Sequence, residues 1–423
     1  MTDRRFAPNR RGRRDAAGAV AGLAVLTLLL APAAAGAGKP RVSPQAALTG
    51  SGTRVAFWAG EAIPGTDWTN PATYWNRRDT RPYTPRLWRV LRRHRIPLYL
   101  GLRYRRDFGP VPAGRPRRGD GLRLLRRANR HGVPVWGWIL VPYTEGYWAW
   151  EGAADEHFDA VRALVRRARA KRLRLRGVVL DPEPPLLTPF ERQAAIMSGG
   201  AGLAPLWDGA IDPARQCRAW RGYARIQRWA ERRAVRIATA PSPLALDDAA
   251  DGRLALQDAA EFVVPKVPWH RVFFQAYRSV FAYYAGRDPG PGIVSSYFRS
   301  AQREFGEGGQ LTLGSAGRGP YRRFAALLHD VRLAATLGAD ELPIYSLERT
   351  LRAYGGPRSV ARLAAAGRRP YAGGRAIAPT QRAAALRAAI RRSDRAIAAA
   401  TPAIAAPGGA SGRPNRWPGG CGG

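Results

Sequence analysis

The stretch Arg176-Gly177-Val178-Val179-Leu180-Asp181-Pro182-Glu183-Pro184-Pro185 joins a short apolar run to two carboxylates that are separated by one residue. Alternate residues of a strand point to the same face, so Asp181 and Glu183 are predicted to project together from one strand end. Pro184 and Pro185 cannot continue a hydrogen-bonded ladder and end the strand directly afterwards. The alternative interpretation is a helix N-cap or a surface turn, where Asp and Pro are common.

Seven further apolar runs resemble this one. They span 54–58, 97–102, 133–141, 235–240, 272–277, 310–313 and 342–346. Most lack polar alternation, as expected of parallel strands buried on both faces. Stretches with helical periodicity lie between them, at 85–95, 122–131, 158–171, 214–233 and 321–337. Eight strands alternating with helices predict an α/β fold, a (β/α)8 TIM barrel whose site lies at the carboxyl ends of the strands.

A doubly wound open sheet is the alternative fold, but it needs a Gly-rich phosphate-binding turn after the first strand. The first run continues instead into Trp58-Ala59-Gly60-Glu61. We therefore expect five parts along the chain. They are a signal peptide at 1–37, a linker at 38–52, a TIM-barrel domain at 53–356, a C-terminal helical extension at 357–406 and a disordered tail at 407–423.

The N-terminal segment has the three regions of a signal peptide in order. Six arginines between residues 4 and 14 precede an apolar stretch at 16–30, and Ala35-Gly36-Ala37 fits a small-x-small cleavage site. The pattern predicts export, so that the protein is secreted or held in the cell envelope, by either the Sec or the twin-arginine route. No later segment is apolar enough to cross a membrane, so we expect no stable membrane span after cleavage.

The chain is strongly basic, with 69 Lys and Arg against 31 Asp and Glu and a net charge of +38. Such a surface attracts polyanions, and in an exported protein an anionic cell-wall polymer is one expected partner. The arginines are spread along the predicted helices and no nucleic-acid motif is present, so no specific nucleic-acid binding is predicted. We expect a monomer.

Cysteine and histidine usage gives no indication of a metal. The two cysteines, Cys217 and Cys421, could form one disulfide in an exported protein. The five histidines lack the spacing of metal ligands. No metal and no other cofactor is predicted.

The residues at the strand ends suit a carbohydrate site. Two carboxylates a few ångströms apart cannot both ionise freely, so one pKa rises and supplies the general acid that glycoside hydrolysis needs. Aromatic rings pack on the C–H faces of sugars, and polar groups bond the hydroxyls. The candidate substrate-binding residues are Trp58, Trp136, Trp138, Tyr143, Gln275 and Glu348. Trp136 and Trp138 could instead fill the barrel interior.

The run Gly177–Glu183 resembles the fourth-strand signature of family 18 glycoside hydrolases, the chitinase-like barrels, which ends in D-x-D-x-E. The resemblance implies that Glu183 is the proton donor and Asp181 the middle acid. Phe274-Gln275-Ala276-Tyr277 resembles the sixth strand of that family, which implies that Tyr277 helps to hold an N-acetyl group. The sequence departs from the pattern at Val179, where the first Asp belongs, and at Trp136-Gly137-Trp138, where S-x-G-G belongs.

The seventh run and its flank, 310–315, contain no carboxylate, although common retaining barrels place their nucleophile there. Either the second acid comes from elsewhere in the chain, or the substrate supplies the nucleophile. The latter is the substrate-assisted route of the chitinase-like families, and the resemblance implies that a 2-acetamido group attacks, that Asp181 and Tyr277 hold that group and that Glu183 protonates the leaving oxygen. The sequence leaves open whether Glu145 or Glu348 replaces one of the acids. It favours an exported O-glycosyl hydrolase acting on a polysaccharide, and the alternative is a non-catalytic carbohydrate- or polyanion-binding barrel of the cell envelope.

Overall fold

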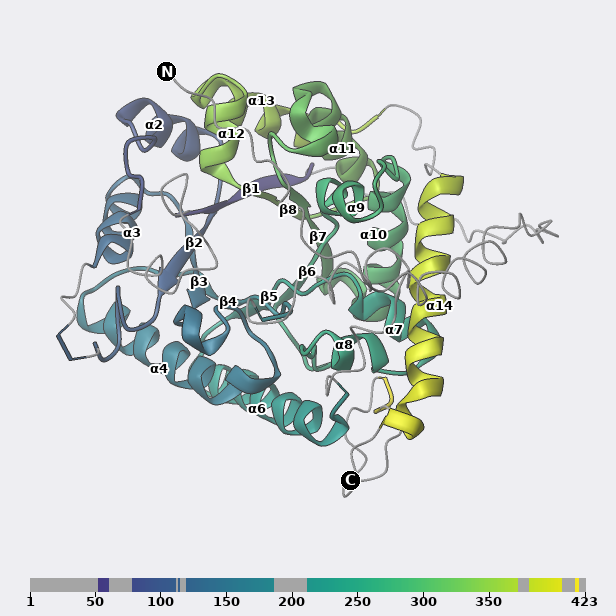
Figure 1. The fold of residues 1–423 in the computed structure, drawn as a ribbon. Helices are drawn as coiled ribbons and strands as arrows, with labels where there is room; N and C mark the ends of the chain where they lie inside the picture. The colour runs from purple at the N-terminus through teal and green to yellow at the C-terminus, as the bar shows by residue number, and fades with distance from the viewer. Residues whose placement is uncertain are drawn as a thin grey trace, which may run out of the picture. The chain divides into compact units, whose positions relative to one another are not determined.

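Eight strands close into a parallel barrel in the computed structural model, which describes residues 52–60, 78–111, 113–114, 119–185, 211–371, 380–404 and 415–417. The strands are β1 (Arg54–Ala59), β2 (Leu98–Arg103), β3 (Val135–Leu140), β4 (Gly177–Leu180), β5 (Ile237–Thr239), β6 (Arg271–Gln275), β7 (Gly309–Gly314) and β8 (Glu341–Tyr345). Each strand pairs with the next, and β8 closes the ring on β1 (Figure 1). All eight lie where the apolar runs predicted them, which confirms the (β/α)8 barrel.

Helices surround the strands on the outside of the ring (Figure 1). They are α2 (Pro85–Arg93), α3 (Asp120–Arg130), α4 (Ala154–Ala170), α6 (Pro213–Glu231), α7 (Ala245–Asp251), α8 (Ala255–Ala259), α9 (Arg278–Tyr284), α10 (Gly292–Phe305), α11 (Phe324–Thr336), α12 (Leu347–Ala353), α13 (Pro357–Gly367) and α14 (Gln381–Ile404). Single 3-10 turns are η2 (Tyr143–Glu145), η3 (Glu151–Ala153), η5 (Gly306–Gly308) and η6 (Gly319–Arg322). The five helical stretches predicted from periodicity correspond to α2, α3, α4, α6 and α11.

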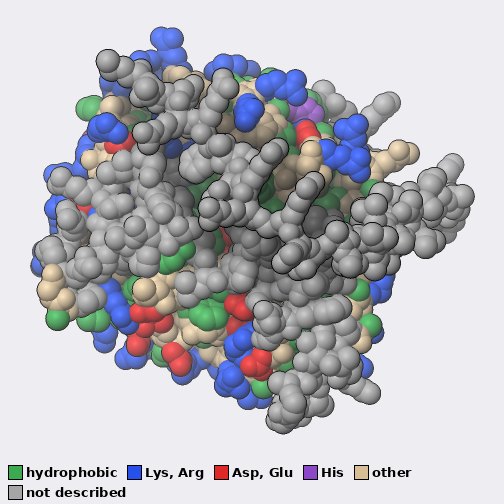
Figure 2. Space-filling view, in the orientation of Figure 1, with side chains coloured by type: hydrophobic (Ala, Val, Ile, Leu, Met, Phe, Trp, Pro, Cys, Tyr) green, Lys and Arg blue, Asp and Glu red, His purple; other side chains and the backbone are tan. Residues whose placement is uncertain are grey.

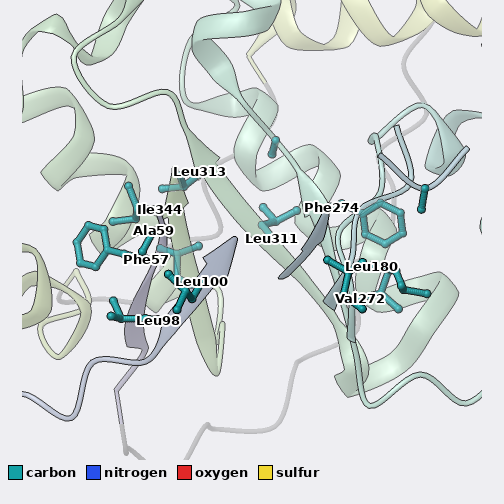
Figure 3. Close-up of a cluster of buried hydrophobic side chains, with 14 of the residues drawn as sticks. Phe57, Ala59, Leu98, Leu100, Leu180, Val272, Phe274, Leu311, Leu313 and Ile344 are labelled. Carbon is teal, nitrogen blue, oxygen red and sulfur yellow. The ribbon is translucent and has the colours of Figure 1, made fainter. Parts of the chain in front are cut away.

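Strand residues alternate between two separate apolar cores, because successive side chains of a strand point to opposite faces. On β4, Val178 and Leu180 join the core between barrel and helices, whereas Val179 joins the core inside the barrel. Figure 3 shows outward-facing strand residues of the first core, among them Phe57 and Leu311. The inner core is largely aromatic. Its members are Ala56, Trp58, Tyr99, Trp136, Trp138, Leu140, Tyr143, Tyr147, Val179, Ala238, Ala240 and Phe273.

Gly177 begins β4 because nothing larger fits there. A Cβ at this position would lie 2.2 Å from the ring of Trp136 and 2.4 Å from the carbonyl oxygen of Arg236. Such distances are well inside van der Waals contact, so even alanine would force the neighbouring strands apart. The glycine thus lets the bulky inner core and the fourth strand occupy the same narrow barrel.

The C-terminal part of the chain packs on the outside of the barrel. Helix α14 runs beside α7, α8 and α10 (Figure 1). Residues 415–417 are fixed by hydrogen bonds, since Leu254 N donates to Asn415 O and Trp417 N donates to Gly252 O. These three residues differ from the disordered tail predicted for 407–423, and the rest of that segment lies outside the described residues.

Two predictions concern parts of the chain that are not described. The signal peptide at 1–37 and nearly all of the linker lie outside the described residues. Cys217 is disulfide-bonded. The other cysteine of the sequence, Cys421, lies outside the described residues. Within the part of the chain that is described, no helix combines the length and the apolar character needed to cross a membrane.

Candidate active site

The acid pair follows β4 in a backbone held from both sides. Ala149 N donates to Asp181 O over 3.0 Å, and Ser242 N donates to Pro182 O over 3.0 Å. The loops after β3 and β5 therefore clamp the 181–183 segment and continue the direction of the strand beyond its last regular residue. Asp181 is then two residues beyond inward-facing Val179, and Glu183 is two residues beyond Asp181, as the alternation predicts.

One side chain brings the two carboxylates together. Nε2 of Gln275, the last residue of β6, lies 2.9 Å from Asp181 Oδ1 and 2.6 Å from Glu183 Oε1. The same nitrogen lies 2.8 Å from the carbonyl oxygen of Ala240. Two N–H protons thus serve three acceptors, so at least one of these contacts is shared. The structure therefore places Gln275 as a partner of both acids, a different position from the substrate contact predicted for it.

Burial and mutual proximity keep protons on the pair. Asp181 is only 3% exposed, and burial, followed by the charge of Glu183 and a hydrogen bond with it, raises the pKa of Asp181 well above its usual range. Burial also raises the pKa of half-buried Glu183 to about 7, while hydrogen bonds from Gln275 and Asp181 lower it. At neutral pH the pair thus holds Asp181 as a neutral acid beside a Glu183 that is poised to exchange its proton.

Aromatic side chains surround the carboxyl ends of the neighbouring strands. Trp138 approaches Asp181 closely enough to lower its pKa, although the indole N–H does not meet hydrogen-bond geometry. The ring of Trp138 lies edge-on to the ring of Tyr345, with 6.4 Å between the ring centres. Tyr345 in turn stacks on Tyr277, with 5.9 Å between the ring centres. Tyr277 and Tyr345 are both partly exposed, so these two rings offer a surface on which a sugar face could pack.

Three of the predicted substrate contacts are buried in the inner core of the barrel. Trp58 is 2% exposed and donates from its indole N–H to Thr312 Oγ1 over 2.8 Å. Trp136 is also 2% exposed and stacks on Tyr99 at 6.0 Å and on His270 at 5.5 Å. Tyr143 is 6% exposed in the same inner core. The interpretation of Trp136 as barrel filling therefore fits its position, and the same role fits Trp58.

Glu348 lies in a structural position. It is 1% exposed at the start of α12 and accepts hydrogen bonds from Gly60 N at 2.7 Å and from the hydroxyl of Tyr83. These bonds tie α12 to the end of β1 and to the chain before α2. The buried side chain therefore does not fit the predicted role in substrate binding.

Glu145 forms a separate cluster with Arg105 and Glu156. Arg105 Nη1 lies 2.9 Å from Glu145, and Arg105 Nη2 lies 3.0 Å from Glu156. Burial, followed by the charge of Glu156, raises the pKa of Glu145 to about 7. Among the contacts described for Glu145, none involves Asp181 or Glu183, so it is not brought into the pair.

The structure adds one residue that the sequence did not indicate. Burial, then Tyr283, then the charge of Glu183 raise the pKa of Tyr284 to about 12, so its hydroxyl lies within electrostatic reach of the proposed acid. Tyr284 is the last residue of α9, seven positions beyond Tyr277. A tyrosine at the end of a helix carries no distinctive signal in the sequence.

Within the described part of the chain, no group of three or more His, Cys, Asp or Glu side chains could hold a metal ion. The carboxylate pair is itself occupied by an amide donor rather than arranged around a cation.

Comparison with known proteins gives similarity of fold only. No family model and no curated protein matches the chain. Among solved structures, a GH5-4 broad-specificity endoglucanase from an uncultured bacterium is 16% identical, with 74% of this chain and 93% of that chain covered and a TM-score of 0.44. A β-glucosidase from Thermotoga maritima is 12% identical, with 70% and 88% covered and a TM-score of 0.42.

The glycoside hydrolase domain of PgaB (BpsB) from Bordetella bronchiseptica is also 12% identical, with 73% of this chain and 98% of that chain covered and a TM-score of 0.41. Mandelate oxidase is among the other structures that match. Similarities of this extent, shared by enzymes with different activities, reflect the barrel and assign neither a family nor an activity to this chain.

Proposed function

We propose that this protein is an exported glycoside hydrolase that acts on a polysaccharide, with Glu183 as its general acid. One observation carries the proposal: Asp181 and Glu183 share the amide of Gln275, and the pKa of Glu183 is raised to about 7. A carboxylic acid that is still partly protonated at neutral pH can protonate a glycosidic oxygen as the bond to the anomeric carbon breaks.

The second acid of the reaction does not come from β7. That strand reads Gly-Gln-Leu-Thr-Leu-Gly and carries no carboxylate. We assign the nucleophile to the substrate, whose 2-acetamido oxygen bonds to the anomeric carbon while Glu183 gives its proton to the leaving oxygen. Asp181 and Tyr277 position the acetamido group. Water then opens the cyclic intermediate, and Glu183 takes back a proton, so protons balance over the cycle.

A non-catalytic barrel is the second candidate, and Val179 favours it. Val179 is fully buried in the inner core, two residues before Asp181, where the family 18 signature has an acid. Proteins that lack one acid of such a set can retain binding and lose turnover. Figure 2 shows Lys and Arg side chains spread around the rim of one face, which supports attraction of a polyanion in either case.

Substitution of the acid distinguishes these functions. Glu183→Gln keeps the size of the side chain and removes the transferable proton, so hydrolysis should fall by about a hundredfold or more. The assay is release of reducing ends from peptidoglycan, chitin and plant polysaccharides by the full chain. Glu145→Gln is the matched control, because Glu145 also has a pKa of about 7 but lies in a different cluster.

Each outcome has a defined meaning. Loss of activity in Glu183→Gln with normal activity in Glu145→Gln supports the enzyme. Equal activity of wild type and Glu183→Gln on a hydrolysed polymer rules out Glu183 as the acid. Binding of a polymer by the wild type with no hydrolysis of any polymer favours the non-catalytic barrel.

A further inference from the structure

A cavity of about 630 Å³ lies outside the barrel, between residues 78–81 and the first turns of α3. Its volume is within the range of small-molecule sites. Its described lining is almost entirely charged. The lining residues are Arg78, Asp79, Thr80, Arg81, Asp120, Arg123, Leu124 and Arg127. Neither acid of the pair nor Gln275 contributes to it, so the cavity is distinct from the candidate active site.

The lining carries four arginines and two aspartates, which gives a charge of +2 (4 − 2). Both aspartates are already engaged. Asp79 accepts from Arg81 Nε over 2.9 Å, and Asp120 accepts from Arg106 over 3.0 Å and from Arg123. The two acids therefore offer little to a further cation, and the field inside the cavity favours an anion.

Arg127 contributes a cation that is oriented without a carboxylate. Its Nη2 donates to Tyr83 O over 2.9 Å, and its guanidinium carbon lies 5.8 Å from the centre of the Trp88 ring. Among the described residues, no carboxylate lies within ion-pair distance of it. A carbonyl and a ring fix the plane of the group, and its remaining N–H donors stay available to a ligand.

Arg78 forms a rigid wall of the cavity. It is fully buried and bonds to Asp107 Oδ2 over 2.7 Å, to Gly60 O over 3.2 Å and to the carbonyl of Gly101. Arg123 and Arg81, in contrast, are 62% and 83% exposed at their side chains. The cavity thus combines buried inner charges with exposed arginines.

We infer that this arginine cavity binds an oxyanion carried by a carbohydrate polymer, either a uronate carboxylate or a sulfate ester. The guanidinium group of arginine can donate two parallel hydrogen bonds to two oxygens of a carboxylate or a sulfate group. A nucleic acid is less suited, because the described lining has no aromatic side chain on which a base could stack. The inference rests on the proposed function, since it specifies an anionic polysaccharide as the class of substrate.

The test measures binding of the full chain to immobilised polymers at two salt concentrations. Hyaluronate presents carboxylates beside 2-acetamido sugars, keratan sulfate presents sulfate esters on a chain that contains 2-acetamido sugars, and glycol chitin is the neutral control. The cavity variant is R123Q/R127Q. The matched variant R221Q/R228Q removes the same charge from exposed positions of α6. R127Q alone leaves the pair of Arg123 with Asp120 intact and serves if the double variant is destabilised.

The cavity variant should weaken binding to one of the anionic polymers about tenfold or more, with a smaller salt dependence, and the stronger of the two responses identifies the oxyanion. The matched variant should change binding less than about twofold. Equal loss in both variants would show general charge attraction, and an equal loss of duplex DNA binding in the cavity variant would show a general polyanion site. Either result overturns the inference.

These results are independent of the acid test. Loss of polymer binding in R123Q/R127Q, with Glu183-dependent hydrolysis still present, supports both proposals. Unchanged binding in that variant, with Glu183-dependent hydrolysis present, rules out only the proposal that the cavity binds the polymer. Binding that depends on the cavity, without hydrolysis by the wild type, rules out only the proposed catalytic function.

Discussion

The amide nitrogen of Gln275 lies 2.6 Å from Glu183 Oε1, and this contact lowers the pKa of Glu183 against the effect of burial. Burial pushes the pKa of Glu183 upward, and the amide donor stabilises the ionised form and opposes that rise. The balance leaves the pKa at about 7. Gln275 is therefore a positioning residue that acts on the reaction through the acid.

Replacement of Gln275 by methionine should move the pH profile of hydrolysis. Methionine keeps the volume and removes the donor, so the pKa of Glu183 rises further. The wild-type kcat/KM should fall above about pH 7 as the acid loses its proton, and in Q275M this descending limb should lie at higher pH. Gln227→Met is the control, since Gln227 is buried on α6 and bonds to Pro268 O. An unshifted limb in Q275M would contradict the role.

Asp181 and Asp107 are both buried, but their substitution by asparagine should affect stability differently. Burial, with the charge of Glu183, raises the pKa of Asp181, so its neutral form resembles asparagine. Burial also acts on Asp107, but Arg78 and backbone donors outweigh it and lower the pKa of that carboxyl. At pH 7, D107N should therefore lower the free energy of unfolding, and D181N should not.

Activity separates the two variants further. D181N should reduce hydrolysis by about a hundredfold, because the amide cannot take up charge beside the reacting group. Urea denaturation and reducing-end release on the same preparations provide the measurements. Full turnover in D181N would exclude a chemical role for Asp181, and a destabilised D181N would show that the carboxyl is ionised in the folded protein.

The strand pattern could be predicted from sequence because a parallel barrel buries both faces of each strand, and eight apolar runs are left as the visible result. The same-face position of Asp181 and Glu183 follows from period two within one strand. The partner that joins them could not be predicted in the same way. Gln275 lies 92 residues beyond Glu183, and its contact depends on the closure of the ring.

Aromatic residues show the limit of sequence pattern more clearly. Trp58 is the fifth residue of β1, and Trp136 and Trp138 are the second and fourth residues of β3. Only Trp138 is recorded as acting on the pKa of Asp181. Depth inside the barrel is set by strand stagger, which a single run does not reveal. The arginine cavity was equally hidden, because it depends on which faces of residues 78–81 and α3 meet.

Asp394 should make stability fall as the pH rises. It is fully buried on α14, and neither oxygen has a hydrogen-bond partner within normal geometry. Burial, followed by the charge of Asp248, raises its pKa to about 11, against a usual value of 3.8. The folded state thus keeps a proton that the unfolded chain loses near pH 4. The contribution of protonated Asp394 to the free energy of unfolding is therefore complete below pH 4 and declines as the pH rises above it.

The variant D394N should remove this decline. Its free energy of unfolding should match that of the wild type near pH 4 and exceed it by about 1 kcal/mol or more at pH 8. Urea denaturation across that range provides the measurement. D155N is the control, because the side chain of Asp155 is 90% exposed. A constant difference between D394N and wild type at all pH values would contradict the assignment of the proton.

A buried ion pair fastens α14 to α7. Arg387 Nε and Nη2 lie 3.0 and 2.8 Å from Asp247 Oδ1, and Tyr297 donates to the other oxygen over 2.7 Å. Removal of the arginine alone leaves a buried carboxyl without its main counter-charge. R387M should therefore cost about 3–5 kcal/mol of unfolding free energy, a larger effect than most single substitutions have.

Removal of both charges should restore most of that loss. In D247N/R387M the methionine stem still packs on Tyr297, which lies 4.2 Å from the guanidinium in the wild type, and the asparagine can still accept from the tyrosine hydroxyl. Replacement of a whole buried pair is often close to neutral, because the desolvation cost of both ions disappears with their attraction. Urea denaturation at pH 7 compares the three proteins with R225M, which breaks the exposed pair of Arg225 with Asp155 and should cost about 1 kcal/mol or less. If R387M were as mild as R225M, or if the double variant were no better than R387M, the pair would not be the contact that fastens the helix.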